Sequence, residues 1–216
     1  MTQPTNVNNI NNVTMNSAAS CTLFKDMLSC DCGVKVVANG SKIDIESKPE
    51  SITENGINYK THTKNDTILT SITVYNGIGL WKLFKNTVFG SEKSLDIKID
   101  GEEYIKQHKF DNTKIKLNNI DINGISELVT TDDLIDENNC IINIFGVSKL
   151  VINRSQENIF FKNMRLSLNG ISKASLYGLN IGVLNGNVNG ISTLNLAKCK
   201  IVSPYFNVEG LSKINY

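Results

Sequence analysis

The sequence is poor in the residues that mark several common classes of protein. Its 216 residues include 3 Pro, 2 His, 1 Trp and 5 Cys. Five cysteines, three of them clustered at Cys21, Cys30 and Cys32, are too few for a disulfide framework, so we expect reduced thiols. No apolar run approaches the roughly 18 residues that a membrane-spanning helix needs. The 22 Lys and Arg nearly balance the 21 Asp and Glu, which excludes a strongly basic surface for nucleic acid.

The N-terminal segment also lacks targeting features. Its sequence, MTQPTNVNNINNVTMNSAAS, has neither the basic start nor the continuous apolar core of a secretory signal peptide. We therefore expect synthesis in the cytoplasm. The excess of Asn, Thr and Ser over residues 1–20 predicts an N-terminal arm without regular structure.

What the sequence has in abundance is a repeat. A glycine, in most copies preceded by Asn, recurs at intervals of 20 to 24 residues. Gly takes a positive φ without penalty and Asn tolerates the left-handed region, so the pair predicts a recurrent sharp corner. The glycines that we expect at these structural corners are Gly56, Gly77, Gly101, Gly124, Gly146, Gly170, Gly190 and Gly210.

The segments on both sides of each glycine repeat as well. Before Gly124, the apolar residues Ile120 and Ile122 flank Asp121. The same places in other copies hold Ile97 and Ile99, Ile142 and Ile144, Leu166 and Leu168, and Phe206 and Val208. After the glycine, five copies continue with an aliphatic residue, a Ser and a second apolar block. This alternation predicts two strands per repeat, each with one buried face.

Equivalent positions in successive copies are similar enough to stack on one another. They predict an all-β fold, a single-stranded parallel β-helix or solenoid with 20–24 residues per coil. Two alternatives stay open. Asn-Gly pairs can also close two-residue hairpins, which would give an antiparallel meander. The spacing of Ile191, Leu194 and Leu196 fits a leucine-rich repeat, although the Asn or Cys ladder of such repeats is missing.

The C-terminal half resembles a known family. Its corners are similar to those in the head domain of auto-transporter adhesins, the GIN domain, over about residues 115–216. The matching corners are Gly124-Ile125-Ser126, Gly146-Val147-Ser148, Gly170-Ile171-Ser172, Gly190-Ile191-Ser192 and Gly210-Leu211-Ser212. The resemblance implies a short right-handed β-helix and no known active site.

We expect three parts along the chain. Residues 1–20 form the Asn-rich arm, residues 21–54 a short N-terminal cap or degenerate first coil, and residues 55–216 the β-helix repeat domain. Residues 22–28 are the only helix candidate and could cap the N-terminal end. Because the chain stops at Tyr216 inside a strand, we expect the C-terminal end of the solenoid to be open and to bind a partner.

Few residues suggest chemistry. Cys30 and Cys32, with Cys21 and His62 nearby, lack the spacing of a zinc site. His62 and His108 stand in polar surroundings and predict surface residues rather than a general base. Acidic clusters occur at Glu102-Glu103, Asp132-Asp133 and Asp136-Glu137, and we expect Asp132 and Asp133 to lie in a solvated turn. The aromatic cluster of Trp81, Phe84 and Phe89 predicts a packing plug or a contact patch. We therefore expect no catalytic residue, metal site or cofactor.

The repeat predicts a non-enzymatic structural or interaction protein. We expect a β-helical rod that is a subunit of a larger assembly, a virion being one example. Its expected partners are proteins, or copies of itself, that bind at the open C-terminal end and the N-terminal arm; nucleic acid and a membrane span are not expected. The alternative is a surface adhesin or carbohydrate-binding β-helix. A polysaccharide-active enzyme ranks last, because it needs paired carboxylates on one face of adjacent coils.

Overall fold

The computed structural model describes residues 9–25, 27–47, 102–110, 113–156 and 158–216, together with the backbone of short strands between residues 51 and 99. Strands dominate these residues, and η1 (Asp132–Leu134), a 3-10 turn, is the one helical element among them. The predicted all-β solenoid of parallel, stacked coils is confirmed.

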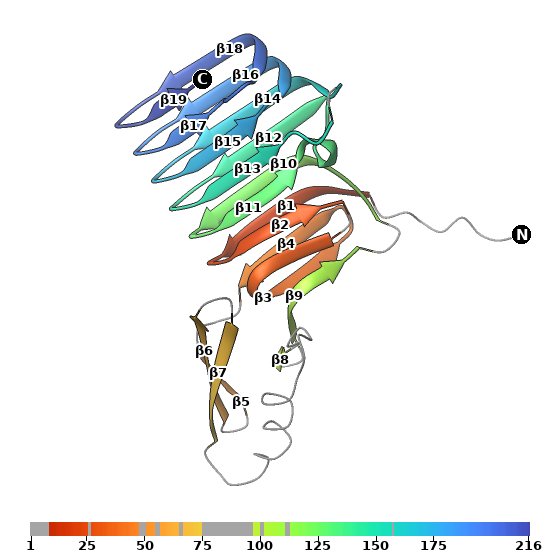
Figure 1. Ribbon diagram of the computed structural model, residues 1–216, viewed down its shortest axis with the longest axis vertical. Coiled ribbons are helices and arrows are strands. Elements are labelled where there is room, and N and C mark those ends of the chain that lie inside the picture. Colours follow the sequence, from red (N-terminus) through yellow and green to blue (C-terminus); the bar gives the residue numbers. More distant parts are fainter. Residues whose placement is uncertain are drawn as a thin grey trace, which may run out of the picture.

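Each coil contributes one strand to each of two parallel ladders (Figure 1). The first ladder contains β1 (Asn9–Ser17), β10 (Lys114–Gly124), β12 (Asn139–Ile144), β14 (Phe160–Leu168), β16 (Asn180–Val188) and β18 (Lys200–Val208). The second contains β2 (Ser20–Phe24), β11 (Glu127–Thr131), β13 (Lys149–Asn153), β15 (Lys173–Tyr177), β17 (Thr193–Asn195) and β19 (Lys213–Asn215). Neighbours in both ladders run parallel, which excludes the hairpin meander; a leucine-rich repeat is excluded because these coils are built from two strands.

The core consists of columns of like side chains between the two ladders. In the first ladder Ile120, Ile142 and Leu166 lie over one another, and all three are buried. In the second ladder Leu128 and Leu150 do the same. Each buried Leu or Ile contributes roughly 1.5–3 kcal/mol, so repetition of one column through successive coils stabilises the rod along its length.

The longer strands of the first ladder bend around this core. In β14 the buried residues Phe161 and Met164 are three positions apart, and both Lys162 and Asn163 between them are exposed. The pairing of β14 with β16 skips Lys162 at the same point. The strict alternation expected before each corner therefore holds near the corner but not along the whole strand.

The first coil is made by the N-terminal leader. Val13 lies opposite Ile120 and Met15 opposite Ile122 in a parallel pair of strands, and all four side chains are buried. The prediction that residues 1–20 form an arm without regular structure is therefore wrong for β1. The apolar residues of this strand are spaced for burial, while the Asn and Thr residues that dominate its composition are largely outside the core.

A long insertion separates this coil from the next. Within it β3 (Met27–Asn39) and β4 (Lys42–Ser47) form an antiparallel hairpin. β4 pairs with β1 and β3 with β2, so the hairpin joins the two ladders and covers the N-terminal end of the solenoid (Figure 1). The expected N-terminal cap is present, but it is a hairpin rather than a coil.

The rest of the insertion is antiparallel as well. β5 (Ser51–Glu54), β6 (Ile57–Lys64) and β7 (Thr67–Val74) form a separate sheet, and β8 (Ile97–Ile99) pairs with β9 (Glu102–Lys109). The expectation that the β-helix fills all of residues 55–216 is therefore wrong: its uninterrupted coils begin at Lys114. Ile97 and Ile99 show the same alternation as the coil strands, yet they belong to a hairpin.

The segment expected to be helical, residues 22–28, contains the end of β2, a turn and the start of β3. β2 ends at Phe24, Lys25 has a φ of 53°, and β3 begins at Met27. The hairpin places Cys21 opposite Cys30, and a disulfide joins them. Our expectation of reduced thiols is therefore wrong for this pair, because spacing along the sequence did not reveal the hairpin register that brings them together.

Candidate functional site

The corner glycines form a line along one edge of the solenoid. Gly124, Gly146, Gly170, Gly190 and Gly210 have φ values between 71° and 89°. A Cβ added at Gly146 would lie 2.6 Å from the carbonyl oxygen of Gly124 in the coil before it. A Cβ added at Gly170, Gly190 or Gly210 would lie about as close to the carbonyl oxygen of the preceding corner glycine. Glycine is thus required both by its backbone angle and by the contact between coils. The other predicted corners, Gly56, Gly77 and Gly101, lie outside the described residues.

Two residues after each of these glycines, a Ser turns inward. The Oγ of Ser172 donates to the carbonyl of Asn169 at 2.7 Å, and Ser192 does the same to Asn189. Ser192 also donates its backbone N–H to the Oγ of Ser212 at 3.1 Å, which links one coil to the next. Because a buried carbonyl without a partner is costly, these hydroxyls satisfy groups that the corner leaves free. The sequence shows that this Ser recurs after each glycine, but not that its hydroxyl binds the corner carbonyls.

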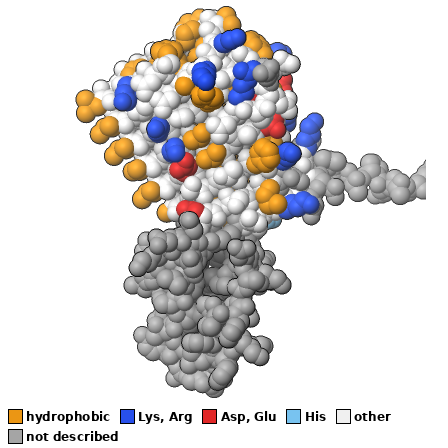
Figure 2. Space-filling model, in the orientation of Figure 1, with side chains coloured by type: hydrophobic (Ala, Val, Ile, Leu, Met, Phe, Trp, Pro, Cys, Tyr) orange, Lys and Arg blue, Asp and Glu red, His pale blue; other side chains and the backbone are white. Residues whose placement is uncertain are grey.

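The residue between the glycine and the Ser points into solvent. We call these five aliphatic residues the corner ridge: Ile125, Val147, Ile171, Ile191 and Leu211, with exposed fractions of 68%, 53%, 56%, 55% and 80%. Figure 2 shows a column of hydrophobic side chains along the edge where the strands turn in Figure 1. Exposed apolar side chains aligned along one edge are a candidate interaction surface.

Backbone hydrogen bonds hold the corner ridge in place. The N–H of Val147 donates to the carbonyl of Gly124 at 2.9 Å, and the N–H of Ile171 donates to that of Gly146 at 2.8 Å. The next two coils repeat this bond at 2.8 Å. Each ridge residue is therefore fixed by the corner below it, and the ridge is a rigid feature.

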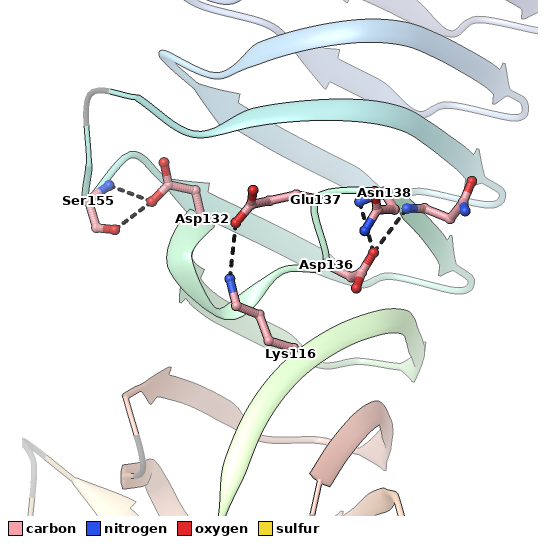
Figure 3. A network of polar contacts seen from close by, with 7 residues as sticks. Lys116, Asp132, Asp136, Glu137, Asn138 and Ser155 are labelled. Atoms are coloured by element: carbon pink, nitrogen blue, oxygen red, sulfur yellow. Dashed lines mark hydrogen bonds and ion pairs between the residues drawn. The ribbon is translucent and has the colours of Figure 1, made fainter.

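In the acidic pair Asp132-Asp133, the first residue links neighbouring coils. The residue Asp132, in η1, is 1% exposed, and its Oδ1 accepts hydrogen bonds from the backbone N–H and the hydroxyl of Ser155 at 2.7 and 2.5 Å (Figure 3). Ser155 follows β13 in the next coil. The expectation that this pair lies in a solvated turn is wrong for Asp132, which links two coils. Asp133 has one buried carboxylate oxygen without a hydrogen-bond partner among the described residues.

The second acidic pair shapes the turn that leads into β12. Asp136 accepts hydrogen bonds from the backbone N–H groups of Asn138 and Asn139 at 2.9 and 3.0 Å. Glu137 forms an ion pair with Lys116 of β10 at 3.4 Å (Figure 3). Both carboxylates thus act locally, one within its turn and one between neighbouring coils.

A second surface feature is a groove on the outer face of the first ladder. Its volume is about 700 Å³, and it runs across β12, β14, β16 and β18. Along its floor Arg165, Asn185 and Tyr205 stand in register on successive strands. Sequence reasoning missed this groove: the repeat places these three residues in one column, but it does not show that the column lines a hollow.

The two free cysteines among the described residues are poor nucleophiles. Burial raises the pKa of the Cys140 thiol to about 12, and nearby Asp136 adds to the effect. Burial also raises the pKa of Cys199, whose Sγ lies 3.2 Å from the carbonyl oxygen of Leu176. Because the thiolate is the reactive form, burial lowers the reactivity of both thiols near neutral pH.

Trp81, Phe84 and Phe89 lie outside the described residues, and His62 is described only as part of the backbone of β6. His108 is half-buried and meets the ring of Phe110 edge-on, with the ring centroids 4.5 Å apart.

The part of the chain that the structure describes contains no group of three or more His, Cys, Asp and Glu that could hold a metal ion. None of its helices has the length and apolar character needed to cross a membrane.

Comparison with known protein families, with curated proteins and with solved structures found no match. The resemblance to the GIN domain therefore stays a prediction that depends on the corner motif. Two surfaces are left as candidates for function, the corner ridge and the outer groove.

Proposed function

We propose that the protein is a non-enzymatic structural protein, a β-helical rod that is a subunit of a larger assembly. The observation that carries this proposal is the corner ridge, a straight line of five exposed aliphatic side chains. Leaving such a row in water is unfavourable, at roughly 25 cal/mol per Å² of apolar surface. A partner protein that covers the ridge recovers this free energy.

The rigidity of the ridge supports an interaction role. Its residues are held by backbone hydrogen bonds between coils, and the glycines before them tolerate no larger side chain. A surface that is already ordered loses little conformational entropy when a partner binds. Polar residues flank the ridge and give it the polar rim that interfaces have. They are Asn123, Asn169 and Asn189 before the corner glycines, and Lys149 and Lys173 after the Ser residues.

The reactive side chains support a structural role over a catalytic one. Asp132 and Asp136 accept hydrogen bonds that fix turns and coils, and Glu137 is paired with a lysine. The pKa of the Cys140 thiol is too high for a nucleophile at neutral pH. These groups stabilise the rod.

The last described coil is a second contact in this proposal. Phe206 and Ile214 belong to its core columns but are only partly buried. Pro204 in β18 has no N–H to donate, which removes one backbone donor from this strand. By contrast, the part of the leader in β1 is buried in the first coil and is not available as a binding arm.

The assembly that we propose is one that leaves the reducing cytoplasm after synthesis, such as a virion. The Cys21–Cys30 disulfide supports this, because structural disulfides persist in oxidising surroundings. The same bond would suit the surface location of an adhesin.

The test is site-specific photo-cross-linking combined with native mass spectrometry. A photoreactive amino acid at Ile171 is expected to capture one dominant species, either a second copy or a partner that co-purifies with the protein from its source. The matched control carries the same group at Phe160 in β14, which is 48% exposed and belongs neither to the ridge nor to the last coil. The double variant Ile171→Lys/Ile191→Lys is expected to lose the complex, while Phe160→Lys keeps it. A monomer at micromolar concentration with equal cross-linking at both positions would refute the proposal.

A further inference from the structure

We propose that the outer groove binds an acidic oligosaccharide, through carboxylate groups on the sugar chain. This inference does not depend on the corner ridge, because it rests on different residues on a different surface. The groove lies on the first ladder, with Arg165 on β14, Asn185 on β16 and Tyr205 on β18. Its volume of about 700 Å³ is within the range of small-ligand sites.

The groove contains polar side chains that have no protein partner. Within the described residues, the side chains of Arg165, Asn185, Asn187 and Tyr205 make no hydrogen bond or ion pair. Elsewhere on the solenoid, outward Asn side chains bond to one another across coils, as Asn195 and Asn215 do at 2.6 Å. The groove therefore departs from the usual pattern of the surface and leaves several donors directed to solvent.

The arrangement of these groups is regular. Arg165, Asn185 and Tyr205 occupy one column, and Ser167, Asn187 and Asn207 occupy the next. Adjacent strands are roughly 4.8 Å apart, so similar hydrogen-bonding groups recur at short, even intervals across the groove. A site with such repetition suits a chain of similar units better than a single compact molecule.

The local charge favours an anion. The three strands β14, β16 and β18 contain no Asp or Glu, and Arg165 is the one charged side chain that lines the groove. Two carboxylates contact residues of the lining: Asp121 accepts a hydrogen bond from Asn143, and Glu209 accepts one from Asn207. The lining itself therefore has one positive charge and no negative charge.

The chemistry of each side chain identifies the occupant. The guanidinium of Arg165 can bind a carboxylate through two parallel N–H donors. The amides of Asn185 and Asn187 offer both donors and acceptors, which match sugar hydroxyls. The ring of Tyr205 is 62% exposed and provides a flat apolar surface for the C–H face of a pyranose. A single aromatic residue does not make the stacking platform that single-stranded nucleic acid requires.

The test is calorimetric titration of the full chain with hexagalacturonate. Neutral cellohexaose, a sulfated heparin hexasaccharide and a short oligo-dT serve as comparison ligands. Hexagalacturonate is expected to bind, cellohexaose to bind at least about tenfold more weakly, and oligo-dT not to compete.

Three variants separate the contributions of charge and shape. Arg165→Gln is expected to weaken hexagalacturonate binding by about tenfold and to leave cellohexaose unchanged, since it removes a charge-assisted bond. Tyr205→Ala is expected to weaken both ligands. Lys162→Gln is the matched control, since it removes a charge from the same strand outside the groove, and should change binding less than about twofold. Circular dichroism checks that each variant is folded.

Several results would overturn the proposal. One is that hexagalacturonate does not bind. A second is that Arg165→Gln and Lys162→Gln weaken its binding equally, and a third is that oligo-dT binds with the same affinity. Each would show that the groove does not recognise a carboxylated sugar chain. Preference for the sulfated hexasaccharide over hexagalacturonate would overturn the assignment of carboxylate as the ligand group.

Discussion

The first coil and the later coils of this solenoid bury similar side chains but are held in different ways. In the later coils each corner glycine lies against the corner below it, with no room for a Cβ. The first coil has Ser17, Ala18 and Ala19 at its corner instead. The difference shows what requires glycine: the later corners have a positive φ and the corner before lies against them, whereas Ser17 does not have a positive φ.

The two regions also end differently. The first coil is covered by an antiparallel hairpin and tied to it by the Cys21–Cys30 bond. The later coils have neither and depend on their stacking, with Ser hydroxyls between successive corners. Stability in the repeated part is thus shared evenly among coils, whereas in the first part it is concentrated in the hairpin and one covalent link.

The largest expected effect comes from adding a methyl group at a stacked corner. Gly170→Ala puts a Cβ 2.6 Å from the carbonyl oxygen of Gly146 and strains a φ of 89°. Strain alone costs roughly 1–2 kcal/mol, and with the clash we expect a loss of about 4 kcal/mol or more in the free energy of unfolding. Urea unfolding monitored by circular dichroism measures it.

The matched control is Gly40→Ala in the hairpin turn. Gly40 has a φ of 58°, and a Cβ there would meet nothing within 4 Å. It should cost only about 1 kcal/mol, the strain without the clash. Similar losses in the two variants would show that contact between corners does not select glycine.

The second-largest effect is expected when the disulfide of the first coil is removed. The bond between Cys21 and Cys30 closes a loop with a sequence separation of 9. Replacing both with Ser is expected to lower the free energy of unfolding by about 2–3 kcal/mol, since the unfolded chain loses a constraint. Hydrogen exchange should rise in β1 to β4 and stay unchanged in β14 to β17. The control is Cys199→Ser, which removes an unpaired thiol from the repeated part, and an equal rise in exchange throughout the rod would contradict this expectation.

The same contrast explains how much of the fold could be predicted. The columns formed by Ile120, Ile142 and Leu166 follow from alternation within each copy and likeness between copies, both visible in the sequence. The first coil could not be found this way. Its strand pairs with a segment about a hundred residues later, across the insertion, and its corner has no glycine to mark it.

The candidate surfaces were less accessible to prediction. The aliphatic residue after each glycine was visible, but alternation cannot tell whether a residue at a sharp corner faces inward or outward. Ile171 is exposed while Ser172 beside it is buried, the reverse of what their polarity suggests. Arg165, Asn185 and Tyr205 each stand five residues before a corner glycine, so their shared column follows from the repeat, but the sequence does not show that this column lines a groove.

The smallest effect concerns pH and the buried thiol of the repeated part. The pKa of Cys140 is raised from 9.0 to about 12 by burial, whereas Cys21 is in a disulfide and does not titrate. Between these two values the unfolded chain releases the proton and the folded chain keeps it. The stabilising contribution is therefore complete below pH 9.0 and is lost as the pH rises toward about 12.

Cys140→Ala isolates this contribution, because every other titrating group is common to both proteins. The wild type should lose about 2 kcal/mol more than the variant between roughly pH 8 and pH 10.5, at about 1.36 kcal/mol per pKa unit. Urea unfolding at the two pH values measures the difference, and any constant loss from the cavity left by the sulfur cancels. The Cys199→Ala variant should show a smaller pH effect, since that thiol is only half-buried. Parallel pH curves for the wild type and Cys140→Ala would mean that water reaches the thiol between β12 and the core, and that the coils pack less tightly than their registers indicate.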